Sequence, residues 1–158
     1  KARGWLYEVH PCHLERPDNT GTLQAQPTFE GGGFDKTARK RPLGQLTTHV
    51  LDTAAGQPAG GMAWVLYRVD PQRSEIASGH TNTDGRNDGP VLEDADFTVG
   101  TYELVFMAGD YFRSRGVDLP EPPFLDRVVL RFGVAEPEGH YHVPLLISPY
   151  GYSTYRGS

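Results

Sequence analysis

Three histidines and one arginine are the residues whose types could carry chemistry in this chain. His49 and His142 each lie within a strand-like run, and His140 precedes His142 by two positions. A neutral imidazole can take a proton from water near neutral pH, so a histidine is suited to general-base catalysis. Taken singly, each histidine is more often structural or simply exposed. Arg86 follows the turn signal Asp84-Gly85, and alone it reads as an exposed turn arginine.

A metal site is an alternative interpretation of the same histidines. His140 and His142 have the His-x-His spacing of strand ligands, and His49 could join them. Glu138 is the nearby carboxylate that could complete such a ligand set. This interpretation is the weaker one, because it leaves Arg86 and the C-terminal residues without a role.

Short alternating runs separated by turn residues must position these side chains. Strands are expected at 45–52, 61–69, 74–81, 100–107, 127–134 and 141–147, with a last short strand ending at Tyr155, and a brief helix is expected at 110–115. Gly and Pro number 19 and 13, which favours many short strands over long helices. The pattern predicts an all-β fold, a two-sheet antiparallel β-sandwich of seven to eight strands with one short helix.

Strand alternation assigns the histidines to the less apolar faces. His140, His142, Pro144 and Leu146 share one face of their strand, opposite the core-like Tyr141, Val143, Leu145 and Ile147. On the first strand Thr47, His49 and Leu51 share a face. The face that carries His49 and His142 also carries Leu51, Pro144 and Leu146, so we expect a partner to cover it.

The first 44 residues differ from the remainder. They hold Gly31-Gly32-Gly33 and a basic cluster, and no strand or helix period persists in them. We expect residues 1–44 to be a flexible N-terminal extension and residues 45–158 to be one domain. Cys12, the single cysteine, lies in the extension and is read as a free surface thiol.

Charge and hydropathy exclude some partners. The net charge of −5 argues against nucleic acid as a partner, and no apolar run approaches the length of a membrane span. No secretory signal is visible, so we expect a cytoplasmic protein, with the periplasm and the peroxisome as alternatives.

The C-terminal residues carry the most specific signal. The chain ends in Tyr155-Arg156-Gly157-Ser158, shortly after His-Tyr-His-Val-Pro-Leu-Leu at 140–146. With Thr-Thr-His-Val-Leu-Asp at 47–52 and Asp-Gly-Arg at 84–86, these motifs make residues 45–158 resemble the 5-hydroxyisourate hydrolases, which are related to the hormone carrier transthyretin. The carrier shares their fold but lacks the two histidines, the arginine and the tetrapeptide.

The resemblance implies a fold, an activity and an assembly. It implies a transthyretin-like sandwich that hydrolyses 5-hydroxyisourate to 2-oxo-4-hydroxy-4-carboxy-5-ureidoimidazoline in urate breakdown. His49, Arg86 and His142 would be catalytic, and His49 and Arg86 would bind substrate together with Tyr155, Arg156, Gly157 and Ser158. Neither cofactor nor metal is implied. The implied assembly is a homotetramer, a dimer of dimers, in which the C-terminal residues of one subunit lie near the histidines of another.

Two rival functions stay open at the level of sequence. A small-ligand carrier would have the same fold without turnover, and an interaction domain with a disordered arm would carry the motifs by accident. The intact motifs argue against both, and exposure of the protein to 5-hydroxyisourate separates all three.

Overall fold

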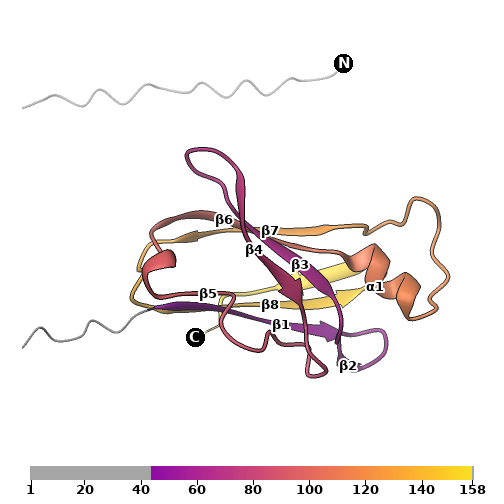
Figure 1. Ribbon diagram of the computed structural model, residues 1–158. Helices are drawn as coiled ribbons and strands as arrows, with labels where there is room; N and C mark the ends of the chain where they lie inside the picture. The colour runs from indigo at the N-terminus through magenta and orange to yellow at the C-terminus, as the bar shows by residue number, and fades with distance from the viewer. Residues whose placement is uncertain (1–43, 158) are drawn as a thin grey trace, which may run out of the picture. The chain divides into compact units, whose positions relative to one another are not determined.

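Two β-sheets stacked face to face make up the described part of the protein (Figure 1). The computed structural model describes residues 44–157. One sheet has the order β2-β1-β8-β9, with β5 also paired to β1, and the other has the order β4-β3-β6-β7. The strands are β1 Gln45–Asp52, β2 Gln57–Pro58, β3 Ala63–Arg68, β4 Ser74–His80, β5 Leu92–Glu93, β6 Gly100–Phe106, β7 Val128–Val134, β8 His140–Ser148 and β9 Gly151–Thr154. A 3₁₀ turn, η1 Asp94–Asp96, and one helix, α1 Ala108–Ser114, complete the described elements.

The predicted β-sandwich with one short helix is confirmed, and one strand pair differs from the expectation. β1 and β8 run parallel, with Gln45 opposite His140 and Asp52 opposite Ile147, whereas the sheets were expected to be antiparallel. Alternation of side chains has the same period in both kinds of sheet, so it carries no information on direction. Most of the chain separates β1 from β8, and no hairpin forces them to be antiparallel.

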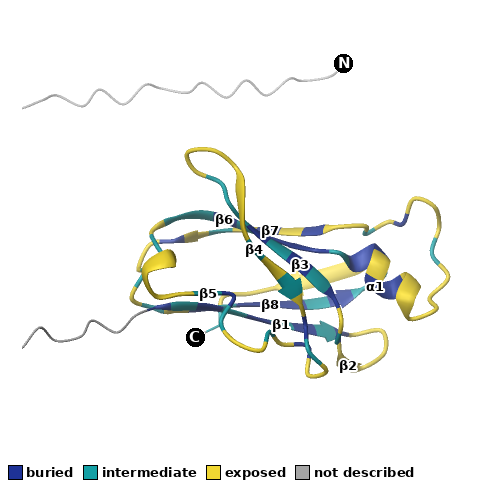
Figure 2. Cartoon of the chain, viewed as in Figure 1, coloured by how far each residue is buried: buried dark blue, intermediate teal, exposed yellow. Residues whose placement is uncertain are grey.

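The core lies between the two sheets (Figure 2). The inward residues of the long strands are buried, as alternation predicts: Leu46, Val50, Trp64, Leu66, Tyr102, Leu104, Phe106, Val128, Leu130, Tyr141, Val143, Leu145 and Ile147. Burial of these side chains removes apolar surface from water and fixes which face of each strand points outward. The outward face of β1 and β8 is therefore free to carry polar groups.

Helix α1 starts two residues before its predicted start. Sequence reasoning missed its first turn, Ala108 and Gly109, because glycine is a weak helix former. The helix buries Tyr111, whose hydroxyl donates to Asp52 Oδ2 at 3.1 Å, and the other oxygen of Asp52 accepts the amides of Ala54 and Ala55. The helix is thereby tied to the end of β1. The two-residue strands β2 and β5 are too short to show any period, and they were not predicted.

The expected extension falls almost wholly outside the described residues. Residues 1–43 and Ser158 are not described, so the assignment of 1–44 as an extension and the role of Ser158 both stay predictions. Gly44 is described and is buried, and its carbonyl accepts the amide of Asp94 at 3.1 Å. Gly44 therefore packs against the residues that follow it.

Candidate active site

Neighbouring strands β1 and β8 bring His49 and His142 to one face of a sheet. Thr47 is the register partner of His142, and His49 is the partner of Pro144. Strands in a sheet lie about 4.8 Å apart and their side chains alternate, so the two histidines are diagonal neighbours on the same face. Both are half-buried, which matches the predicted assignment of faces.

The turn that contains Asp84, Gly85 and Arg86 lies against β1 and brings Arg86 to His49. The amide of Val50 donates to the carbonyl of Gly85 at 2.8 Å, and Arg86 forms an antiparallel bridge with His49. Gly85 has a φ of +71°, and a Cβ on it would lie 2.3 Å from the carbonyl oxygen of Val50. Only glycine fits this close approach, so Gly85 sets the position of Arg86.

Asn82 stabilises the same turn, and sequence reasoning did not single it out. Its side-chain oxygen accepts the backbone amides of Asp84 at 3.0 Å and Arg86 at 3.1 Å. The backbone amide of Asn82 donates to the carbonyl of Arg86 at 2.7 Å. An asparagine two residues before Asp-Gly is the signal of such a turn. It was available in the sequence and was overlooked.

Burial and the guanidinium of Arg86 both favour neutral histidines. Burial lowers the pKa of His49 below its ordinary value of 6.5, and the charge of Arg86 lowers it further, against the opposing effect of a backbone hydrogen bond with Asp84 and of the Asp84 carboxylate. Burial also lowers the pKa of His142, followed by the effects of Arg86, His140 and His49. Arg86 thus acts on both histidines, and both can accept a proton at neutral pH.

Thr47 connects two histidines of β8. Its hydroxyl lies 2.8 Å from Nε2 of His140 and 2.9 Å from Nδ1 of His142. The sequence placed Thr47 on the same face as His49, but it could not reveal this contact. The contact depends on the register between β1 and β8, which alternation does not fix.

The C-terminal residues return to the histidines of their own chain. The amide of Gly157 donates to the carbonyl of His142 at 2.9 Å, and the two residues form an antiparallel bridge. A Cβ on Gly157 would lie 2.8 Å from Cδ2 of the His142 ring. Gly157 thus packs on His142 within one chain, and the expected approach of these residues to the histidines of another subunit stays a prediction.

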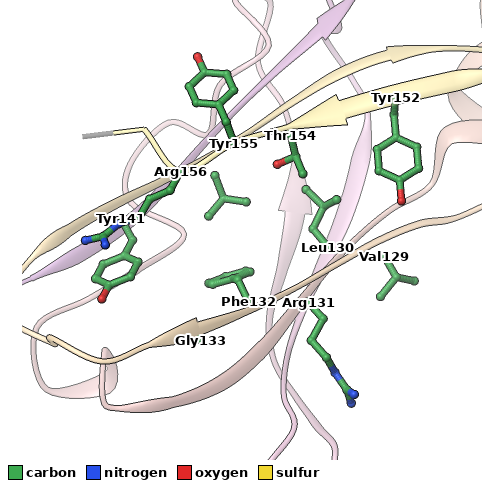
Figure 3. A pocket seen from close by; sticks show the side chains of 11 residues that line it. Val129, Leu130, Arg131, Phe132, Gly133, Tyr141, Tyr152, Thr154, Tyr155 and Arg156 are labelled. Atoms are coloured by element: carbon green, nitrogen blue, oxygen red, sulfur yellow. The ribbon is translucent and has the colours of Figure 1, made fainter. Parts of the chain in front are cut away.

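Arg156 and Tyr155 have different surroundings from Gly157. The Arg156 guanidinium lies 4.4 Å from the centre of the Tyr141 ring (Figure 3), a cation–π contact that anchors the last residues to β8. The Tyr141 hydroxyl in turn accepts the amides of Ala135 and Glu136. Tyr155 is 59% exposed. Among the described C-terminal residues, Gly157 contacts His142, a predicted catalytic residue, and Ser158 lies outside the described range.

A separate apolar groove lies between β7 and β9, the edge strands of the two sheets. Val129, Phe132, Tyr152 and Tyr155 are among its lining residues (Figure 3), and His49, Arg86 and His142 are not. The groove has no acid–base pair of the kind that hydrolysis needs. In this the groove differs from the outer face of β1 and β8, which carries His49 and His142.

The alternative interpretation of the histidines was a metal site. Within residues 44–157, no three His, Cys, Asp or Glu side chains gather in a way that could hold a metal ion. Nε2 of His140 and Nδ1 of His142 both contact the hydroxyl of Thr47 instead.

Within residues 44–157, no helix is long and apolar enough to cross a membrane.

A family model and a curated relative each match most of this chain. The HIUase/Transthyretin family model matches residues 46–157. A 5-hydroxyisourate hydrolase of Pseudomonas aeruginosa is 63% identical over 123 residues, which span 77% of this chain and 98% of that relative.

Solved structures share the fold. The 5-hydroxyisourate hydrolase of Klebsiella pneumoniae has a TM-score of 0.62 at 34% identity, over 73% of this chain and 99% of that one. Sea bream transthyretin in complex with thyroxine has a TM-score of 0.63 at 30% identity, over 72% and 94% of the two chains. The family model covers His49, Arg86 and His142, and the chain therefore belongs to the HIUase/Transthyretin family.

Proposed function

We propose that this protein hydrolyses 5-hydroxyisourate to 2-oxo-4-hydroxy-4-carboxy-5-ureidoimidazoline, a ring-opening step in urate breakdown. The observation that carries the proposal is the gathering of His49, Arg86 and His142 on one face of the β1–β8 pair, with Gly157 packed on His142. Relatives up to 66% identical are named 5-hydroxyisourate hydrolases, which supports the same substrate here.

Hydrolysis of the ring amide needs a base, a nucleophile and a place for negative charge. In the proposed reaction a neutral histidine removes a proton from water, and the water oxygen bonds to the ring carbonyl carbon. The carbon–nitrogen bond then breaks, and the imidazolium returns the proton to the leaving nitrogen. The product has gained one water, with a carboxylate at the attacked carbon.

Arg86 has two roles in this proposal. Its guanidinium donates to the carbonyl oxygens of the substrate and stabilises the negative oxygen that develops in the transition state. It also helps burial to keep His49 and His142 neutral, because a second positive charge nearby is unfavourable. One histidine acts as base and the other orients the water. In this proposal no cofactor or metal takes part.

We also propose that the protein assembles as a homotetramer, a dimer of dimers. The edge strands β7 and β9 carry apolar side chains exposed to water, with Val129 46% and Tyr152 49% exposed. Such side chains on unpaired strand edges favour association with a second copy. The apolar groove between these strands would then be filled by the partner. Sedimentation velocity checks the tetramer, and a monomer at micromolar concentration contradicts it.

The ultraviolet decay of freshly prepared 5-hydroxyisourate tests the function. We expect the protein to accelerate the decay well above the spontaneous rate and to yield a product that is heavier by one water. Binding without acceleration would indicate a carrier instead. A protein that neither binds the substrate nor accelerates its decay would instead be an interaction domain.

A further inference from the structure

The hydroxyl of Thr47 bridges two imidazoles, and this bridge limits where protons can lie. Thr47 Oγ1 lies 2.8 Å from His140 Nε2 and 2.9 Å from His142 Nδ1, both within the range of a normal hydrogen bond. A hydroxyl has one proton to donate and lone pairs to accept. The oxygen could also accept from both imidazoles, but the Thr47 proton would then have no acceptor among the described residues. We therefore take one imidazole to donate to Thr47 and the other to accept from it.

Two arrangements meet this condition when the histidines are neutral. In the first, His142 donates its Nδ1 proton to Thr47, Thr47 donates to Nε2 of His140, and Nε2 of His142 is unprotonated. In the second, His140 donates its Nε2 proton to Thr47, Thr47 donates to Nδ1 of His142, and Nε2 of His142 carries a hydrogen. A neutral imidazole with a hydrogen on Nε2 and its other nitrogen occupied has no lone pair left for water.

We propose that Thr47 and His140 are positioning residues that hold His142 in the first arrangement, with Nε2 as the general base. The inference rests on the proposed hydrolysis and assigns the base role between the two histidines. Arg86 and His49 also act on His142, and a guanidinium has donors only. An unprotonated Nε2 suits a positive neighbour better than an N–H does.

The bridge also provides a path for the proton that His142 takes up. When water gives a proton to Nε2, the Nδ1 proton can pass to Thr47, and the Thr47 proton can pass to His140. His140, which is exposed, then holds the positive charge, and His142 is neutral. The reverse transfer returns the proton for the leaving nitrogen, so the residues regain their starting state.

The groups that face His142 come from three elements. His140 lies on β8, with its ring centre 6.3 Å from that of His142, His49 lies on β1, and Arg86 lies on the turn beside β1. Of these groups His140 is the one that shares a hydrogen-bond partner with His142. A change at His140 should therefore alter the proton positions on His142 without contact with the substrate.

Nitrogen-15 NMR of the histidine rings tests the arrangement in the full-length protein without substrate. We expect the wild-type His142 to carry its proton on Nδ1. In Thr47→Val the acceptor is lost, and the two tautomers should mix. In His140→Phe the hydroxyl is free to donate to Nδ1, so His142 should switch to the Nε2–H form. A wild-type His142 with its proton on Nε2 overturns the inference.

Kinetics give the second readout, with matched controls. Thr47→Val should lower kcat by about tenfold with KM within about twofold, a smaller loss than the ~100-fold or more expected for removing the base itself. Thr47→Ser keeps the hydroxyl and should restore kcat. Thr53 follows the end of β1, and its hydroxyl donates to the carbonyl of Ile147 rather than to a histidine. Thr53→Val is therefore the control and should leave kcat unchanged.

The outcomes separate this inference from the proposed function. Wild-type protein without turnover removes the proposed hydrolysis, while the NMR result still decides the tautomer. Wild-type turnover with equal kcat values for the wild type and Thr47→Val overturns the role of Thr47. Equal losses in Thr47→Val and Thr53→Val also overturn it, because both would then reflect general destabilisation.

Discussion

Replacement of Gly157 by alanine should damage catalysis while leaving the fold intact. A Cβ at this position would lie 2.8 Å from Cδ2, 3.0 Å from Cβ and 3.2 Å from Cγ of His142. Carbon atoms in contact prefer a separation of about 3.5–4.0 Å, so either the C-terminal residues or the imidazole must move by about 1 Å. Either movement disturbs the His142 ring and its bond to Thr47.

The expected loss follows from that displacement. A misplacement of about 1 Å at a catalytic group can cost about 100-fold in rate, so we expect kcat/KM to fall by about 10- to 100-fold. Gly157 lies beyond the last core strand, and the free energy of unfolding should change by less than about 1 kcal/mol. The ultraviolet decay of 5-hydroxyisourate measures the first quantity and thermal unfolding the second.

Gly151→Ala is the matched control. It adds the same methyl group on β9, where the nearest atom is Ser148 Oγ at 3.8 Å, an ordinary contact. We expect this variant to keep its kcat/KM. If Gly157→Ala has the kcat/KM of the wild type, the packing of Gly157 on His142 has no catalytic importance and the reasoning is refuted.

Four further predictions follow from the site. The lowered pKa values should place the acid limb of kcat/KM below pH 6.5, and Arg86→Gln should move the limb towards 6.5 because repulsion is removed while burial remains. The free energy of unfolding should be largest above pH 6.5 and should fall as the pH drops from 6.5 through the lowered pKa values, because the unfolded chain takes up protons first; a flat profile from denaturant titrations would contradict this. Gly85→Ala should destabilise the protein by about 1–3 kcal/mol and also lower kcat/KM, because a side chain at positive φ is strained and Arg86 is displaced; an unchanged denaturation midpoint would count against it. Deletion of residues 155–158 should abolish most turnover with little change in the thermal midpoint, and full activity in the truncated protein would exclude a catalytic role for these residues.

Much of the framework could be predicted from local pattern. Alternation in 45–52 and 141–147 assigned His49 and His142 to outward faces, because most inward positions hold apolar side chains that must be buried. The Asp-Gly signal located the turn that carries Arg86. These are short-range features, and the sequence displays them directly.

Long-range features could not be predicted in the same way. The parallel pairing of β1 and β8 and its register are set by how the two sheets pack, and they alone decide that Thr47 meets His140 and His142. The return of Gly157 to His142 depends on the path of the chain after β9. The motif of the family marked these C-terminal residues as important without showing what they touch.

The most direct test of the account is turnover of 5-hydroxyisourate by three single variants, His49→Asn, His142→Asn and Arg86→Lys, each shown to be folded by circular dichroism. We predict that either histidine variant loses about 100-fold or more in kcat/KM, as expected for loss of a general base or its partner. Arg86→Lys should also be impaired, because a point charge cannot replace the planar donor fork. Folded variants that all turn over substrate at the wild-type rate would contradict the assignment of this face as the active site.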